Sequence, residues 1–339
     1  MEDAWIFDAS AESLDFPGAV DMVYPIVQDR EPPEGVRRAL VDAVGKVARY
    51  PHLEREVSVA IGGYLGIPAN RVLSAAGGNG ALDLISRAFL AGRKVVVPLP
   101  AFWQIADAPR RHGARLSTPS LLGEDPVPAI LAAFDDADAI MLCSPNNPLG
   151  CDLPAGLVPA LLERSAGRPV VIDESYADMT GESHASTLHP DLVLARGFKV
   201  WTIPGARVGY IVAAPERLRA CAAMRPPFES GVFAEAAALG AIEAIDDVRR
   251  IWDEVRADLR YLERRLAEIG GTVTPSRTLF ANWRHPEAVR VWSELKKRKI
   301  FCLSAESGVV YGMPDDMLRF TARRPDVVDH VAEEIKKIL

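Results

Sequence analysis

The sequence contains few cysteines and histidines, and none of them is spaced as a metal site. The four cysteines, Cys143, Cys151, Cys221 and Cys302, form no C-x-x-C pair, and the six histidines form no H-x-x-x-H or H-E-x-x-H pattern. Structural and catalytic zinc sites need ligands at such short intervals. We therefore expect no bound metal.

An excess of positive charge is also missing. The chain has 39 Lys and Arg against 46 Asp and Glu, which gives a net charge of −7. Nucleic acids and anionic membranes select for clustered Lys and Arg. The one basic run, at 296–299, is typical of a solvated helix end. We expect neither a nucleic-acid nor a membrane partner.

Targeting signals are absent as well. No apolar run reaches the length that spans a bilayer. Residues 1–16, MEDAWIFDASAESLDF, lack the basic start and long apolar stretch of a signal peptide. We therefore expect a cytoplasmic protein with reduced thiols.

Helical periodicity alternates with short β-rich runs from about residue 57 onwards. Helices are expected at 57–67, 81–92, 157–167 and within 229–269, and strands at 72–78, 94–100, 139–148, 169–176 and 206–214. Continuous apolar runs such as 95–97 and 170–172 indicate a buried, mostly parallel sheet between helices. The last 70 residues mix short strands (FANWR, LRFTAR) with two amphipathic helices, as in a second α+β layer.

The predicted fold class is thus α/β, with two parts. A chain of 339 residues is long enough for one large and one smaller domain. We place the large, ligand-binding domain at 35–240 and build the small domain from 1–34 and 241–339.

Polar segments follow the apolar runs, where ligands bind in open α/β sheets. Gly77-Gly78-Asn79-Gly80 opens a helix and could offer backbone N–H groups to a phosphate, or could be only a tight turn. It lacks the G-x-G-x-x-G pattern of NAD sites. SPNNPLG at 144–150 is typical of a rigid loop. In DESY at 173–176, the aspartate could either cap a helix or face a ligand.

Lys199 lies in ARGFKVWTIPGARVGY, among apolar residues. Lysine is rarely buried unless it is paired or used chemically. One interpretation is a side chain that extends to water; the other is an amine that forms a Schiff base, with Arg207 nearby for a phosphate. Asn147, Asp173 and Lys199 are each 26 residues apart, which suits one βα unit between them.

Together these segments resemble the fold-type I, pyridoxal phosphate-dependent aminotransferases of classes I and II, most of all their histidinol-phosphate aminotransferase branch. SPNNPLG is similar to the family's S/N-P-N-N-P-T-G, DESY to its D-E-x-Y, and K…PGARVGY to its K…G-x-R-x-G-Y. The similarity extends from RYP at 49–51 to LRFT at 318–321.

The resemblance implies roles around the cofactor. Lys199 would form the Schiff base and transfer protons, Asp173 would hold the pyridine nitrogen protonated, and Tyr176 and Asn147 would reach the phenolic oxygen. Arg207 would bind the phosphate. The helix start would add backbone contacts from Gly78, Asn79 and Gly80.

It also implies roles further out. Phe102 falls where the family stacks an aromatic ring on the cofactor, although core packing is an alternative and Trp103 is adjacent. Tyr50 matches a tyrosine that reaches the partner's phosphate, so a homodimer with shared active sites is expected. Arg319 matches the arginine that binds the substrate α-carboxylate, with Asn147 beside it.

Three departures from the family pattern concern substrate and phosphate. Arg196 and Phe198 stand where the family has hydroxyl residues before the lysine, so Arg196 either replaces a hydroxyl or points elsewhere. IFCLSAES at 300–307 has no arginine for a substrate phosphate, so we expect an unphosphorylated substrate. VYPIVQDREPPEG at 23–35 replaces an N-x-N-P-x-G motif that lines the substrate entrance.

The predicted function is transfer of an amino group between an amino acid and a 2-oxo acid, in amino-acid metabolism. A decarboxylase, lyase or cyclase using the same cofactor is the alternative, because the same residues serve each outcome. A binding or regulatory protein without turnover is disfavoured by the intact set Asp173, Lys199 and Arg207.

Overall fold

The computed structural model describes residues 18–339 except 25 and 28, so the expectation for segment 1–16 lies outside the described residues. The main helices are α1 (Glu34–Val44), α2 (Glu54–Leu65), α3 (Gly77–Ile85), α4 (Trp103–Arg111), α5 (Val127–Asp135), α6 (Leu157–Glu163), α7 (Ala177–Thr180), α8 (Pro215–Met224), α9 (Val232–Glu243), α10 (Ile245–Ile269), α11 (Ala288–Lys297) and α12 (Pro325–Ile338). The strands are β1 (Val20–Asp21), β2 (Val72–Ala76), β3 (Lys94–Val96), β4 (Ala101–Phe102), β5 (Arg115–Ser117), β6 (Ala139–Cys143), β7 (Val170–Asp173), β8 (Leu192–Gly197), β9 (Val208–Ala213), β10 (Thr272–Thr274), β11 (Phe280–Arg284), β12 (Ile300–Phe301), β13 (Val310–Tyr311) and β14 (Met317–Thr321).

A seven-stranded sheet in the order β2-β9-β8-β7-β6-β3-β5 forms the centre of the larger part of the molecule. Strand β9 is antiparallel to both of its neighbours, and the remaining pairs are parallel. The prediction of a mostly parallel sheet is therefore confirmed.

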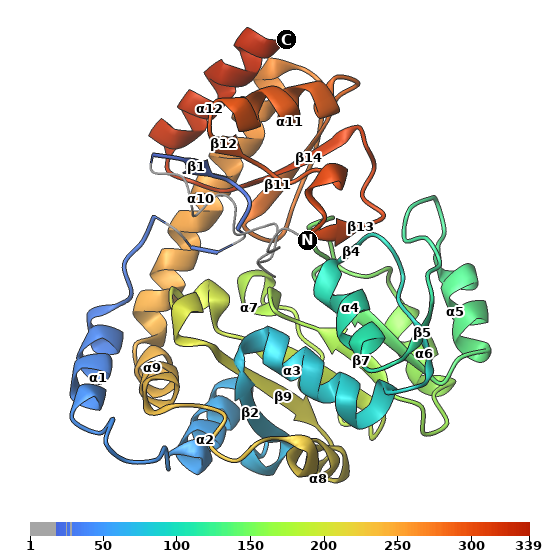
Figure 1. Cartoon of the computed structure of the whole chain (residues 1–339), viewed down its shortest axis with the longest axis vertical. Coiled ribbons are helices and arrows are strands. Elements are labelled where there is room, and N and C mark those ends of the chain that lie inside the picture. The colour runs from blue at the N-terminus through green and yellow to red at the C-terminus, as the bar shows by residue number, and fades with distance from the viewer. Residues whose placement is uncertain (1–17, 25, 28) are drawn as a thin grey trace, which may run out of the picture.

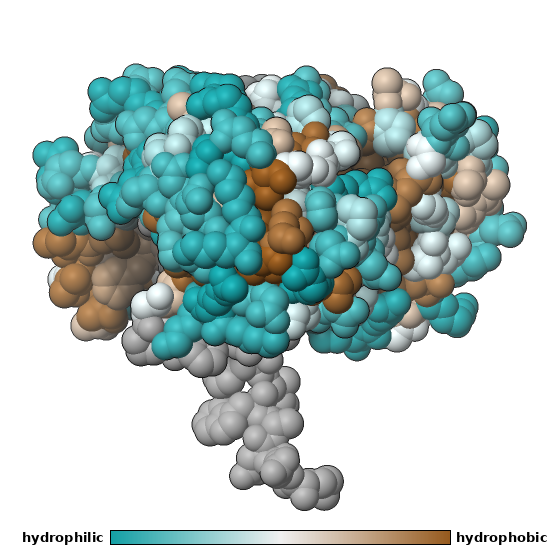
Figure 2. All heavy atoms as spheres, turned by 90° about the horizontal axis from the view of Figure 1, so that it is seen from above, coloured by the Kyte–Doolittle hydropathy of each residue, from teal (hydrophilic) through white to brown (hydrophobic). Residues whose placement is uncertain are grey.

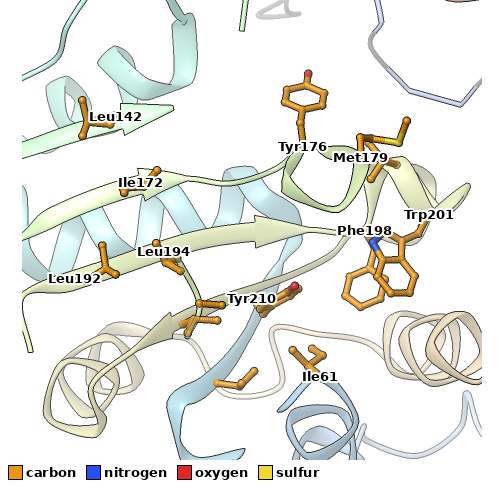
Figure 3. Close-up of a cluster of buried hydrophobic side chains, with 14 of the residues drawn as sticks. Ile61, Leu142, Ile172, Tyr176, Met179, Leu192, Leu194, Phe198, Trp201 and Tyr210 are labelled. Carbon is orange, nitrogen blue, oxygen red and sulfur yellow. The ribbon is translucent and has the colours of Figure 1, made fainter. Parts of the chain in front are cut away.

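Helices cover both faces of this sheet, as its side-chain alternation requires. On one face Leu142, Ile172 and Leu194 pack in a core shared with α2, α5, α6 and α9. Figure 3 shows these strand side chains in neighbouring positions. Their sequence neighbours Met141 and Val171 pack on the opposite face, against α3, α4 and α8. Burial on both faces explains why the strands are continuous apolar runs.

A second layer, at the top of Figure 1, combines the antiparallel sheet β10-β11-β14 with α10, α11 and α12. Helix α10, 25 residues long, extends from the large sheet into this layer, where Leu259 and Leu266 pack with Trp283 and Phe320. The expected second α+β layer is confirmed, while the boundaries 35–240, 1–34 and 241–339 remain predictions. In the described part of the chain no helix is both long and apolar enough to cross a membrane.

The start of α3 differs from the expected helix at 81–92. The glycine segment is itself the first turn of α3, which begins at Gly77 with a left-handed φ of +75° and ends in a π-helical turn, Ser86–Leu90. Strand β9 passes very close to this first turn. A Cβ placed on Gly209 would lie 2.2 Å from the carbonyl carbon of Gly77.

We therefore predict that Gly209→Ala lowers the free energy of unfolding by about 1–3 kcal/mol, because backbone cannot yield to the added methyl group. Gly205→Ala is the matched control, since a Cβ there has no atom within 4 Å. Urea unfolding of both variants checks the prediction. Equal stability of the two variants would contradict it.

Candidate active site

A cavity of about 660 Å³ opens at the carboxyl ends of the parallel strands, below the second layer. Strands β6, β7 and β8 are paired so that Cys143 lies opposite Asp173 and Asp173 opposite Ala195, which places the segments that follow them at one edge. The cavity brings together most of the predicted site residues: Gly78, Asn79, Phe102, Asn147, Asp173, Tyr176, Lys199, Arg207 and Arg319.

Asp173 is the last residue of β7 and is only 4% exposed. Its Oδ1 accepts hydrogen bonds from the backbone N (2.9 Å) and the Oγ (2.5 Å) of Ser175. Burial raises the pKa of this carboxyl group, and the nearby charge of Lys199 partly opposes that shift. A buried carboxylate that borders a cavity is suited to a cationic ligand atom.

Lys199 and Tyr176 lie together on the cavity wall. Lys199 begins a 3-10 turn (Lys199–Trp201) just after β8, and its Nζ is 3.7 Å from the centroid of the Tyr176 ring. The Tyr176 hydroxyl is buried without a hydrogen-bond partner among the described residues. Burial raises the pKa of this phenol. An amine and an unsatisfied phenol thus face the same space.

Arg207 and the first turn of α3 form an anion site. Arg207 has a left-handed backbone (φ 55°, ψ 45°), and its guanidinium rests against Gly77, where an added Cβ would lie 2.6 Å from Nη2. The first turn of α3 has no side-chain cap and no acidic residue. Exposed N–H groups, the helix dipole and a guanidinium together favour a phosphate.

Arg319, on β14, enters the cavity from the second layer and is only 2% exposed. One guanidinium nitrogen donates to Asn147 Oδ1 and another to the backbone oxygen of Val23. Its Nε has no partner among the described residues, and burial lowers its pKa to about 10. Such a buried, incompletely satisfied cation is suited to a carboxylate or phosphate.

The aromatic residues Phe102 and Trp103 both border the cavity. Their rings meet edge to face, with centroids 5.7 Å apart. Phe102 is held by the pairing of β4 with β13 and also packs on the core beneath. Phe102 thus packs on the core and borders the cavity, and its stacking on a cofactor stays a prediction.

Three expected residues lie outside the cavity lining. Gly80 lies inside the first turn of α3, where an added Cβ would face Ala76, and its backbone contact with a phosphate stays a prediction. Arg196 does not replace the missing hydroxyl: it points to the opposite side of β8 and is bonded to other buried residues. Tyr50 is 74% exposed and stacks on Phe228, so its contact with a partner subunit stays a prediction.

The structure also adds residues that we did not predict. Ser175, inside DESY, holds Asp173, and Leu303 and Val310 line the cavity from the second layer. Segment 23–35 was expected at the substrate entrance, and its residues Val23, Tyr24, Ile26 and Val27 do line the cavity. The pairing of β1 with β12 brings that segment there, and no local sequence signal predicts such a long-range contact.

This donor set fits pyridoxal phosphate. The cofactor needs a carboxylate for its pyridine nitrogen, a donor for its phenolic oxygen, an amine for its aldehyde and a cationic phosphate site. Asp173, Tyr176, Lys199 and Arg207 present these groups around one cavity. The unsatisfied Tyr176 hydroxyl is the clearest sign that a ligand belongs there.

Comparisons with known proteins agree with the site. Residues 23–335 match the family described as aminotransferase class I and II. Histidinol-phosphate aminotransferase of Thermococcus kodakarensis is 30% identical over 256 residues, covering 73% of this chain and 74% of that protein.

Two solved structures share the fold. Histidinol-phosphate aminotransferase from Sinorhizobium meliloti, in complex with pyridoxal-5'-phosphate, has a TM-score of 0.87 at 22% identity, over 97% of this chain and 93% of that one. L-threonine-O-3-phosphate decarboxylase from Porphyromonas gingivalis has a TM-score of 0.80 at 21% identity, over 94% and 98%. From its site, its family match and its relatives, the chain belongs to the aminotransferase class I and II family and is a pyridoxal phosphate-dependent aminotransferase.

Proposed function

We propose that this enzyme transfers an amino group between an amino acid and a 2-oxo acid, with the cavity residues in distinct roles. The observation that carries the proposal is the meeting of Asp173, Tyr176, Lys199 and Arg319 around one cavity. When bound, pyridoxal phosphate supplies an electron-accepting ring and an aldehyde carbon. The protein must supply binding, orientation and proton transfer.

Four residues hold the cofactor in this proposal. Asp173 keeps a proton on the pyridine nitrogen, and its burial strengthens that contact. Tyr176 Oη donates to the phenolic oxygen. Asn147 Oδ1 accepts from Arg319, so its amide nitrogen is the group left to donate to the cofactor. Arg207 binds the phosphate together with the first-turn N–H groups of α3.

Lys199 and Arg319 act on the substrate. Lys199 Nζ accepts the proton from the substrate Cα and later returns it, while the face of Tyr176 stabilises its charged form. Arg319 holds the α-carboxylate. Pairing with a buried guanidinium stabilises that carboxylate as an anion, which favours loss of the Cα proton over loss of carbon dioxide.

The expectation of an unphosphorylated substrate is not supported. The relative from Thermococcus kodakarensis is named for histidinol phosphate, which is a phosphate ester. The expectation relied on the missing arginine at 300–307. A guanidinium binds phosphate as well as carboxylate, so Arg319 could itself hold a phosphate group.

A homodimer with shared active sites completes the proposal. Exposed apolar side chains include Val41, Val44 and Val47 near α1, and Tyr50, which stacks on Phe228. Figure 2 shows apolar spheres at its left edge, on the side where α1 lies in Figure 1. Apolar side chains exposed on one side of a protein favour a protein interface there. The cysteines of the described residues are unpaired, which suits our proposed location in the reducing cytoplasm.

The role of Lys199 predicts the site of covalent attachment. Borohydride reduction followed by peptide mapping should find the cofactor on Lys199. Lys199→Ala should carry no label and should lose kcat by roughly 10²–10⁴-fold, because a positioned acid–base group is gone. Lys94→Ala, on β3 and outside the cavity lining, is the control. A label on another lysine would contradict the assignment.

The role of Arg319 predicts a substrate-dependent defect. Arg319→Ala should raise KM for amino acids by about 10–100-fold, the value of a charged hydrogen-bonded pair. Amines without an acidic group should be affected little. Arg284 lies on β11, the strand that pairs with the β14 strand of Arg319, and forms an exposed ion pair with Asp316. Arg284→Ala is the control and should leave KM unchanged. Wild-type KM in Arg319→Ala would mean that the carboxylate is bound elsewhere.

The shared site predicts complementation between subunits. Light scattering should show a dimer. Tyr50→Phe should weaken cofactor binding about tenfold, for one lost hydrogen bond to a charged group. Mixing Tyr50→Phe with Lys199→Ala subunits should yield heterodimers with one site free of both changes and therefore restored activity. A monomeric native protein, or no recovery on mixing, would refute the shared site.

A further inference from the structure

A buried cation lies just behind the cavity wall. Arg196 is only 2% exposed and does not line the cavity. Its Nε donates to Tyr210 Oη at 2.8 Å, its Nη1 to Glu174 Oε2 at 2.7 Å, and its Nη2 to Asp178 Oδ1 at 2.6 Å. We call these four residues the Arg196 cluster. Each acidic partner is itself buried, so the contacts are shielded from water.

The cluster joins the two segments that carry the reacting groups. Glu174 and Asp178 stand two residues before and two residues after Tyr176. Asp178 Oδ2 also accepts from Trp201 Nε1 at 2.9 Å, and Trp201 ends the turn that Lys199 begins. Asp178 therefore links the Tyr176 segment to the Lys199 turn, and the Arg196 guanidinium holds Asp178 and Glu174 in place. The planar fork of arginine fixes both partners at once, which a lysine could not do.

On the cavity side, the Tyr176 ring faces the Lys199 amine, whose Nζ lies 3.7 Å from the ring centroid. The Tyr176 hydroxyl has no partner among the described residues, and its ring meets Phe280 only edge to face, at 5.6 Å. Figure 3 shows Tyr176 pointing away from Phe198 and Trp201, which lie together beyond the end of β8. The Arg196 cluster holds the backbone of the same segment from the other side, through Glu174 and Asp178.

Other titratable groups face the cluster and Tyr176. Tyr64 Oη donates to Asp178 at 2.9 Å, and His184 Nδ1 lies 2.9 Å from Glu174. Tyr176 itself is influenced by the charges of Lys199 and Arg319 and by Cys143.

We propose that Arg196 is a positioning residue: through Glu174, Asp178 and Trp201 it sets the placement of the Tyr176 hydroxyl relative to the Lys199 amine. This inference rests on the proposed function, because it assigns both groups to the cofactor site. The departure from the family pattern at Arg196 thus has a function that is not phosphate binding.

Trp201→Phe is the sharpest test, because it keeps an aromatic ring and removes the hydrogen bond to Asp178. In the holoenzyme we expect kcat to fall about tenfold while KM changes little, since orientation and not binding is lost. The pH midpoint of the bound cofactor's absorbance should rise by about one unit. The displaced Tyr176 hydroxyl would no longer donate to the cofactor's phenolic oxygen, so the deprotonated form of the cofactor would be less stable. Trp283→Phe is the matched control: a buried tryptophan that donates to Gly270 O in the second layer. It should leave kcat and the midpoint unchanged.

Arg196→Lys supplies the second test. A lysine can serve one carboxylate of the pair, so kcat and the absorbance midpoint should lie between wild type and Trp201→Phe. If Arg196→Lys does not fold, Trp201→Phe decides alone. Wild-type kcat and midpoint in Trp201→Phe would overturn the proposal, even if its Tm fell as far as that of Trp283→Phe. Failure of the proposed function would give a different result, because Lys199→Ala would then keep the kcat of the wild-type enzyme.

Discussion

The parallel register of β6, β7 and β8 is the constraint on which the rest of the structure depends. It sets Cys143, Asp173 and Ala195 side by side, and the chain beyond each strand then turns into the same cavity. A slip of one residue in any pair would turn Asp173 or the Lys199 turn toward the other face of the sheet. The continuous apolar strands, buried on both faces, hold this register through packing.

Two buried arginines near the cavity differ in how fully their polar atoms are paired. The Arg196 guanidinium has a partner for each of its three nitrogens, and it faces away from the cavity. Arg319 Nε and Tyr176 Oη, by contrast, are buried without partners among the described residues, and both residues border the cavity. Since an unsatisfied buried group is costly, these two are the groups that a ligand would complete.

The fold alone does not choose the reaction. The structure of L-threonine-O-3-phosphate decarboxylase from Porphyromonas gingivalis resembles this chain with a TM-score of 0.80, although its name describes another outcome. Amino-group transfer and decarboxylation differ in which group of the substrate the protein binds and in which bond at the substrate Cα then breaks. In the function we propose, that decision belongs to the part of the cavity where Arg319 is bonded to Asn147 and Val23.

The sequence by itself determined the sheet and the centre of the site, because the segments that follow apolar strands must meet at one edge. Asn147, Asp173 and Lys199 could be placed together for that reason, and Arg207 by its short distance along the chain. Only the tertiary structure decided the position of Arg196. Side chains alternate between the two faces of β8, and that of Arg196 lies outside the cavity lining, where it binds Glu174. The tertiary structure also decided the entrance: Val23 and Leu303 reach the cavity because β1 pairs with β12, a contact between distant segments that no local pattern encodes.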